Sequence, residues 1–300
     1  MHAEYQRGNY RVLAQIRDGD SGSSPAIISL CEGKLPIRVR SFYNALWIQF
    51  NTDWSDTSTG FNVSYTAEKL RDKFLLLTAS RVKRIIRMGL DVPSNIVVPL
   101  DGVDNPVAVD FDPVQDRIYW ADTGLKEIRS AFLNGSDSKV VVTLSAKSVA
   151  EWVAVDPVSR LVFYSDAGND VIVMLRMSSW EQKTVVSSGL SKPRSIVLDT
   201  ADGLLFWTDL DQEAKIERAN YDGSERQTLV TEDLLYPNSL ALDKANDRLY
   251  YVDAGTNLIA WTNLAGTQRK TISVSFIAHF FGVTLYKDYL YVTDWGFAGC

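Results

Sequence analysis

Five aspartates recur at nearly constant spacing along the chain, and carboxylates are groups that could do chemistry. Consecutive members are 44, 43, 44 and 41 residues apart. Carboxylates can ligate a metal ion or act as general acids and bases. An active site, however, needs unlike groups that converge on one point, whereas this pattern repeats one acid at one place, which favours a structural acceptor for backbone N–H groups. The five residues are Asp122, Asp166, Asp209, Asp253 and Asp294.

Other groups that could carry catalysis are scarce. The chain has two histidines, His2 and His279, too few for a histidine-rich zinc site. No HExxH, GxSxG, P-loop or dinucleotide-binding motif is present, and no plausible Ser-His-Asp set can be assembled. We therefore predict no catalytic residue, no metal site and no cofactor, and we do not expect an enzyme.

Composition and charge exclude further classes of function. The chain has 300 residues, of which 46% are apolar and 23% charged, as in ordinary globular proteins. Its net charge of −6 offers no basic surface for nucleic acid. Its uninterrupted apolar runs are only a few residues long, so we predict no membrane span within this chain.

The aspartates belong to a longer repeat that must position them. Each repeat aspartate ends a four-residue string that begins with an aromatic residue. In the first four strings, a second acid stands seven residues before that aromatic residue, at Asp112, Asp156, Asp199 and Asp243. Each string is followed by a turn, an alternating segment, a Gly-containing or polar turn and a short β-rich run. Four strands in about 43 residues with an aromatic-Asp signature predict a β-propeller, whose blades are four-stranded sheets packed face to face.

The strings themselves resemble the YWTD repeat of the low-density lipoprotein receptor family. They are Tyr119-Trp120-Ala121-Asp122, Phe163-Tyr164-Ser165-Asp166, Phe206-Trp207-Thr208-Asp209, Tyr250-Tyr251-Val252-Asp253 and Tyr291-Val292-Thr293-Asp294. The resemblance covers about residues 74–295 and implies a six-bladed propeller. Segments 192–199, 236–243 and 281–285 are similar to the Wnt co-receptor branch of low-density lipoprotein receptor-related proteins. By our strand count the ring stops before closure, so we expect a fragment.

Residues 1–70 lack the repeat and alternate in hydrophobicity, which predicts antiparallel strands. Their order resembles the C-terminal half of a CUB domain, an extracellular β-sandwich. The pairing of Cys31 and Cys300 stays open, and Asp53 matches one acid of the CUB calcium site without the rest of the set. The predicted chain is therefore all-β, with a partial CUB β-sandwich over 1–67, a linker over 68–73, and an incomplete six-bladed YWTD propeller over 74–300.

Function is expected on one face of the propeller. The loop that enters each innermost strand opens on that face, so residues about 43 apart in sequence become neighbours there. Tryptophan, arginine and phenylalanine beside amides are typical of protein interfaces. In the Wnt co-receptor branch this face resembles a surface that receives an Asn-containing peptide, and Arg194 and Asn238 match the pattern, although Ser239 replaces the usual glycine. The candidates are Asn105, Glu151, Trp152, Arg194, Asn238 and Phe281.

The sequence thus predicts an extracellular or cell-surface receptor ectodomain fragment that binds an extracellular protein or peptide ligand, in Wnt-type signalling or endocytosis. Signal and membrane segments would lie outside this chain. Asn62 and Asn134 begin glycosylation triplets if the chain is exported. A secreted basement-membrane linker like nidogen is the main alternative. A calcium-dependent lactonase is a third, and it would need acids and amides that converge on a central metal.

Overall fold

The computed structural model describes residues 5–7, 10–18, 21–24, 26–30, 46–52, 73–91, 94–210, 213–274 and 278–295. These residues form β-strands and turns, with two one-turn 3-10 helices, Ser80–Val82 and Lys244–Asn246. The predicted all-β class is confirmed. The chain divides into two compact units, Met1–Arg71 and Asp72–Cys300, which are described separately below.

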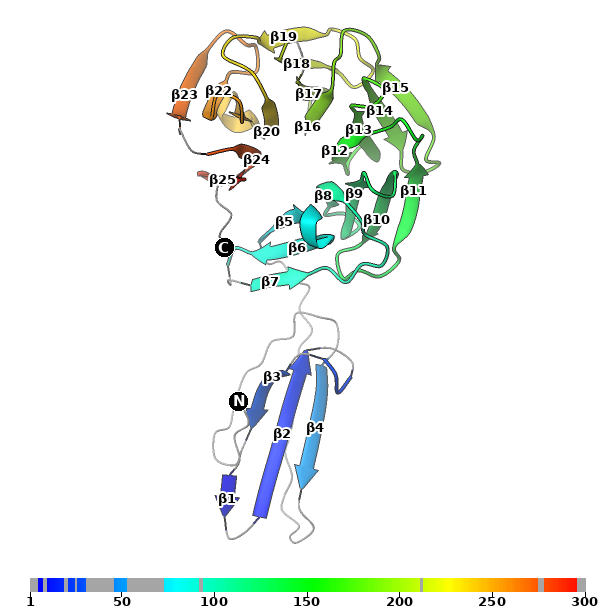
Figure 1. Ribbon diagram of the computed structural model, residues 1–300, viewed down its shortest axis with the longest axis vertical. Helices are drawn as coiled ribbons and strands as arrows, with labels where there is room; N and C mark the ends of the chain where they lie inside the picture. Colours follow the sequence, from blue (N-terminus) through cyan, green and yellow to red (C-terminus); the bar gives the residue numbers. More distant parts are fainter. Residues whose placement is uncertain are drawn as a thin grey trace. The chain divides into compact units, whose positions relative to one another are not determined.

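The first unit contains one antiparallel sheet built around a long strand, β2 (Tyr10–Asp18). This strand pairs with β1 (Tyr5–Arg7), β3 (Ala26–Leu30) and β4 (Leu46–Thr52) (Figure 1). The turn before β3 is closed by Arg17, whose Nη1 donates to the carbonyl of Ser24 at 2.8 Å. Cys31, Asp53, Asn62 and Cys300 lie outside the described residues, so their predicted roles stay predictions.

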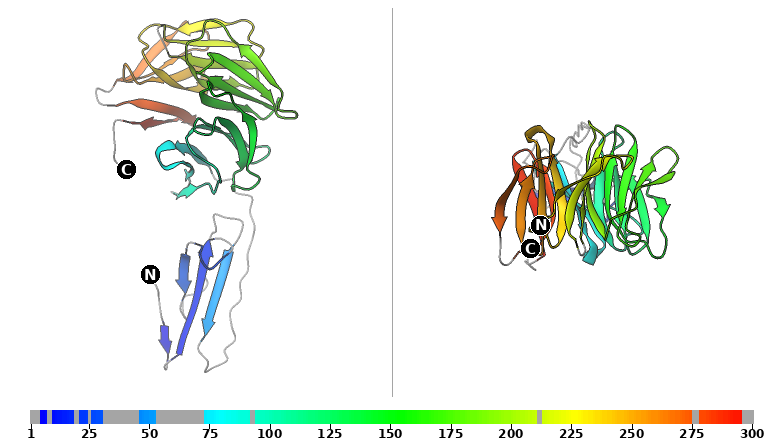
Figure 2. Two further views of the ribbon diagram at one scale, coloured as in Figure 1. Left: turned by 45° about the vertical axis from the view of Figure 1, so that its right-hand side comes forward. Right: turned by 90° about the horizontal axis from the view of Figure 1, so that it is seen from above.

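The second unit is a β-propeller with four complete four-stranded blades arranged in a ring (Figures 1 and 2). The first two blades comprise β8 (Pro106–Asp112), β9 (Arg117–Asp122), β10 (Glu127–Phe132) and β11 (Lys139–Thr143), then β12 (Ala150–Asp156), β13 (Leu161–Asp166), β14 (Val171–Arg176) and β15 (Gln182–Val186). The next two comprise β16 (Pro193–Asp199), β17 (Leu204–Asp209), β18 (Lys215–Asn220) and β19 (Gln227–Val230), then β20 (Pro237–Asp243), β21 (Arg248–Asp253), β22 (Leu258–Thr262) and β23 (Arg269–Val274).

Two smaller sheets flank these blades. One is three-stranded, with β5 (Phe74–Ala79), β6 (Arg84–Gly89) and β7 (Ser94–Val97), and the other pairs β24 (Phe280–Tyr286) with β25 (Tyr289–Asp294). Strands β8, β12, β16, β20 and β24 lie on the inside of the ring, each next to its counterpart in the following sheet (Figure 1). The predicted propeller is confirmed, and the described residues supply four complete blades and two smaller sheets of the expected six-bladed ring.

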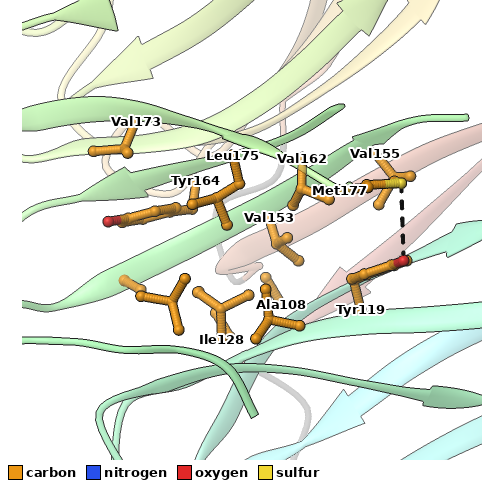
Figure 3. Packing of buried hydrophobic residues seen from close by; sticks show 14 residues of the cluster. Ala108, Tyr119, Ile128, Val153, Val155, Val162, Tyr164, Val173, Leu175 and Met177 are labelled. Atoms are coloured by element: carbon orange, nitrogen blue, oxygen red, sulfur yellow. Dashed lines mark hydrogen bonds between the residues drawn. The ribbon is translucent and has the colours of Figure 1, made fainter. Parts of the chain in front are cut away.

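The core lies between the faces of adjacent blades. Successive side chains of a strand point to opposite faces, so Tyr119 packs towards β12–β15 while Trp120 packs towards β5–β7. Figure 3 shows the first of these interfaces, where Ile128 and Val153 from neighbouring blades meet. Trp120 and Trp207 are fully buried. The aromatic residues of the repeat therefore fill the space between blades, and this packing holds the innermost strands at fixed distances around the ring.

A candidate ligand-binding rim built on β-bulges

The innermost strands begin on one face of the propeller, which we call the rim. Near that end the pairing of each innermost strand with its neighbour is irregular, in the manner of a β-bulge, in all four complete blades and in the β24–β25 sheet. A bulge leaves a residue unpaired and re-aims its side chain. The bulged residues include Glu151, Arg194, Asn238 and Phe281, which are four of the six predicted rim candidates.

Arg194 connects these four residues. Its Nη1 donates to Oδ1 of Asn238 at 2.8 Å. Its Nη2 lies 3.6 Å from Oε2 of Glu151, and its guanidinium carbon lies 4.6 Å from the centre of the Phe281 ring. The structure therefore brings together side chains from β12, β16, β20 and β24, which are up to 130 positions apart in the chain. We call Glu151, Arg194, Asn238, Phe281 and Trp295 the rim cluster.

Asn238 holds this cluster in place. Its side chain is 95% buried, with a relative exposure of 5%. Besides accepting from Arg194, it donates from Nδ2 to the carbonyl of Phe280 at 2.8 Å. Both ends of the amide are thus used within the protein, and Asn238 positions Arg194 and the start of β24.

Trp295 also belongs to the rim cluster, although it was not among the predicted rim candidates. Its ring stacks on Phe281, with centroids 4.6 Å apart and an interplanar angle of 9°. It is 72% exposed, and Leu235 and Tyr236, on the loop that enters β20, are 56% and 58% exposed. A signal was present in the sequence, because Trp295 directly follows the last repeat aspartate. The rim thus carries large apolar groups in solvent, as protein-binding surfaces do.

The two remaining candidates lie differently. Trp152 is partly buried and packs against the cores on both sides of its blade, so it fills space between blades. Asn105 donates from Nδ2 to Oγ1 of Thr123 at 2.6 Å, within its own blade. Among the described residues, neither side chain forms a hydrogen bond, ion pair or cation–π contact with Arg194.

The charge of Arg194 is incompletely balanced. Burial lowers the pKa of its guanidinium, and the Glu151 carboxylate opposes that shift. The 3.6 Å between Nη2 of Arg194 and Oε2 of Glu151 makes an ion pair but is too long for a hydrogen bond. The side chain of Arg194 has a relative exposure of 19%. Arginine stays protonated in proteins. The rim therefore presents a partly desolvated cation, which can donate a further hydrogen bond to a carboxylate or carbonyl oxygen of a ligand.

The repeat aspartates build the loops of the rim. Asp253 accepts from the backbone N–H groups of Leu235 and Tyr236 at 2.8 and 3.0 Å, and from those of Gly255 and Thr256 at 2.8 Å. The other four accept equivalent backbone bonds from the loops that enter their own innermost strands: Asp122 from Asp104 and Asn105, Asp166 from Val149, Asp209 from Ser191, and Asp294 from His279. Each carboxylate thus ties one rim loop to its blade.

In the described part of the chain, no group of three or more His, Cys, Asp or Glu side chains is placed to hold a metal ion. Nor do those residues form a helix long and apolar enough to cross a membrane. Asn134 is exposed in the turn between β10 and β11, and its Oδ1 accepts from the N–H and the hydroxyl of Ser136 at 3.0 and 2.7 Å.

Known protein families match both units. The low-density lipoprotein receptor repeat class B matches residues 203–244, and the CUB domain matches residues 1–65. Both resemblances expected from the sequence are therefore confirmed.

Solved structures share the propeller. A chain in the crystal structure of a nidogen/laminin complex is 29% identical, with a TM-score of 0.68, and the match covers 74% of this chain and 85% of that one. A gluconolactonase of Xanthomonas campestris is 17% identical with a TM-score of 0.58, covering 74% of this chain and 78% of its own, a likeness of fold alone.

A human relative shares most of its length with this chain. The low-density lipoprotein receptor-related protein 5-like protein of Homo sapiens is 32% identical over 182 residues, which are 61% of this chain and 72% of the human protein. Identity at this level over most of the relative, together with the class B repeat and the blade architecture, establishes common descent. The chain belongs to the low-density lipoprotein receptor-related protein family.

Proposed function

We propose that the rim cluster captures an extended segment of an extracellular protein, and that the chain works as the ligand-binding part of a cell-surface receptor. Family membership supports a receptor-type or linker-type propeller that binds proteins. The observation that carries the proposal is Arg194, a partly desolvated cation held by side chains of three neighbouring sheets. Such pre-organised arginines are over-represented among the residues that dominate binding energy.

The chemistry of the rim suggests how a peptide would bind. The guanidinium of Arg194 would receive a carbonyl or carboxylate oxygen, because Glu151 leaves part of its hydrogen-bonding capacity open. The stacked rings of Phe281 and Trp295 offer an exposed aromatic platform beside it. The resemblance to the Wnt co-receptor branch favours a segment that contains asparagine, whose amide can pair with such polar groups while its neighbours cover the rings.

Surface plasmon resonance on the immobilised chain tests this proposal. The probes are short extended peptides with a central asparagine and the same peptides with alanine at that position. We expect Arg194→Ala to weaken binding at least tenfold, or about 1.4 kcal/mol, and Trp295→Ala to weaken it several-fold. The matched control is Arg176→Ala, which removes an exposed arginine from the opposite end of its blade. Equal effects of the two arginine substitutions would contradict the proposal.

A linker that holds laminin is a second candidate function. It is favoured by the match to a chain of the nidogen/laminin complex, which at 29% identity covers 85% of that chain. The same sensor surface should then bind purified laminin, and Arg194→Ala should weaken that binding as well if the rim is used. Binding of laminin without binding of the asparagine peptides would favour the linker function over the receptor function.

A further inference from the structure

A second candidate binding site lies on the face opposite the rim. Each innermost strand runs from the rim to the other face, so the turns after β8 and β12, and those after β10 and β14, all lie on that opposite face. Between the blades β8–β11 and β12–β15 these turns border a half-open cavity of about 350 Å³, which we call the basic cavity. Its walls include Arg117, Lys139, Arg160, Tyr119, Phe132 and Trp180.

The cavity combines cations with aromatic walls. Three basic side chains line it, and no carboxylate of the described residues does. Arg117 stacks over Phe132, with its guanidinium carbon 4.4 Å from the ring centre, and Tyr119 lies 6.2 Å from Trp180. Tyr119 donates its hydroxyl hydrogen to Sδ of Met177, another residue of the lining, at 3.9 Å (Figure 3).

The three cations are not equally neutralised. Arg160 pairs with Asp112 at 2.5 Å, and Arg117 pairs with Asp137 at 2.6 Å. Lys139 lies 3.9 Å from the same Asp137 carboxylate, beyond hydrogen-bonding distance, and its side chain is 47% exposed. Two carboxylates therefore serve three cations, and Lys139 is the one whose charge is most available to a bound anion.

The backbone at Trp180 is unusual. Its φ is +57°, in the left-handed region, which a bulky residue rarely adopts. The corresponding turns of two other blades place an acid in the same conformation, Asp137 at +50° and Glu225 at +52°. The positive φ therefore belongs to the turn itself, and it fixes where the side chain at this position points. In this blade alone among the three, a large aromatic ring is held at the cavity beside Tyr119.

From this arrangement we infer that the basic cavity binds a small amphipathic anion, in which one acidic group is joined to a flat apolar body. The acidic group would face Lys139 and Arg160, and the apolar body would lie between the rings of Phe132 and Trp180. The volume fits a molecule of one or two rings, since ligand sites of this kind begin near 300 Å³. The inference is independent of the rim, because the two sites lie at opposite ends of the strands.

Ligand-observed NMR titration of the full chain tests the inference with three probes: naphthalene-1-sulfonate, the uncharged 1-naphthalenemethanol, and inorganic sulfate. We expect the sulfonate to bind with a dissociation constant of about 1 mM, which is ordinary for a ligand of this size. The other two probes should bind at least about fivefold more weakly, since each lacks one half of the recognised chemistry.

Two substitutions and a control locate the site. Lys139→Gln should weaken sulfonate binding about threefold or more, and Trp180→Gly about tenfold, while glycine accepts the positive φ without strain. Lys183→Gln, which changes an exposed lysine on β15 outside the cavity, should leave binding unchanged. The inference is overturned if the sulfonate binds no better than the alcohol or inorganic sulfate, or if Lys183→Gln weakens binding as much as Lys139→Gln.

Discussion

The carboxylate of Asp110, on the innermost strand β8, accepts a hydrogen bond from the backbone N–H of Val155 on the next innermost strand, β12, at 2.7 Å. Two further pairs repeat this link: the Ser195 hydroxyl accepts from the N–H of Leu240, and the Ser239 hydroxyl from that of Val283, both at 3.1 Å. Side chains thus satisfy N–H groups on the open inner edges of these strands and tie neighbouring blades together.

The link at Asp110 predicts a pH-dependent stability. Burial raises the pKa of this carboxyl to about 6, against 3.8 for the free group, so the folded protein holds a proton that the unfolded chain has lost. The resulting stability is fully present below pH 4 and is lost as the pH rises through 6. In Asp110→Asn the amide oxygen can still accept from Val155. Relative to wild type, the variant should gain up to about 3 kcal/mol between pH 4 and pH 7.

Urea unfolding at both pH values checks this prediction. The quantity to compare is the difference in unfolding free energy between Asp110→Asn and wild type, because other titrating groups cancel in it. A difference that is the same at pH 4 and pH 7 would show that folding does not raise the pKa of Asp110.

The buried tryptophans should dominate stability while the exposed one should not. Trp207 is fully buried between two blades, with the Arg226 guanidinium 5.3 Å from its ring centre. Trp207→Ala should lower the free energy of unfolding by about 3–5 kcal/mol. Trp295→Ala is the matched control, and since Trp295 is 72% exposed, it should change stability by less than about 1 kcal/mol. Similar losses in the two variants would contradict the packing described here.

Loss of a repeat aspartate should loosen its own rim loop. Asp253→Ala leaves four backbone N–H groups without their acceptor, which should cost about 2–4 kcal/mol. Hydrogen exchange should speed up first at the amides of Leu235 and Tyr236. Glu232→Ala is the control, because that side chain is exposed on the same loop and accepts none of these four hydrogen bonds. Uniform acceleration over all blades would argue against a local role.

Two glycines should respond differently to alanine. A Cβ on Gly168 would overlap the carbonyl oxygen of Lys147, so Gly168→Ala should destabilise by about 1–3 kcal/mol and shift the loop that enters β12. Gly203 has φ +66° but nothing within 4 Å, so Gly203→Ala should cost about 1 kcal/mol through the backbone alone. Thermal melting of both variants measures the difference, and the order of the two should not reverse.

Local pattern was sufficient to predict the blades and the place of the rim, because alternation and turn chemistry are read over a few residues. The spacing of Asp122 and its four counterparts located the loops that enter β8, β12, β16, β20 and β24, and the class of fold followed from it. Four rim candidates met as expected because bulges at the start of β12, β16, β20 and β24 aim them alike. Trp152 did not join them, since its ring finds more contact between blades.

The amino-acid sequence by itself thus determined the strands, the blade repeat and the family, all of which depend on residues close together in the chain. Only the tertiary structure decided that Asn238 is buried beneath Arg194, that Trp295 stacks on Phe281, and that Lys139 and Trp180 share a cavity. The physical reason is that these relationships join different blades or loops. Their geometry is set by how whole sheets pack around the ring, which no local pattern encodes.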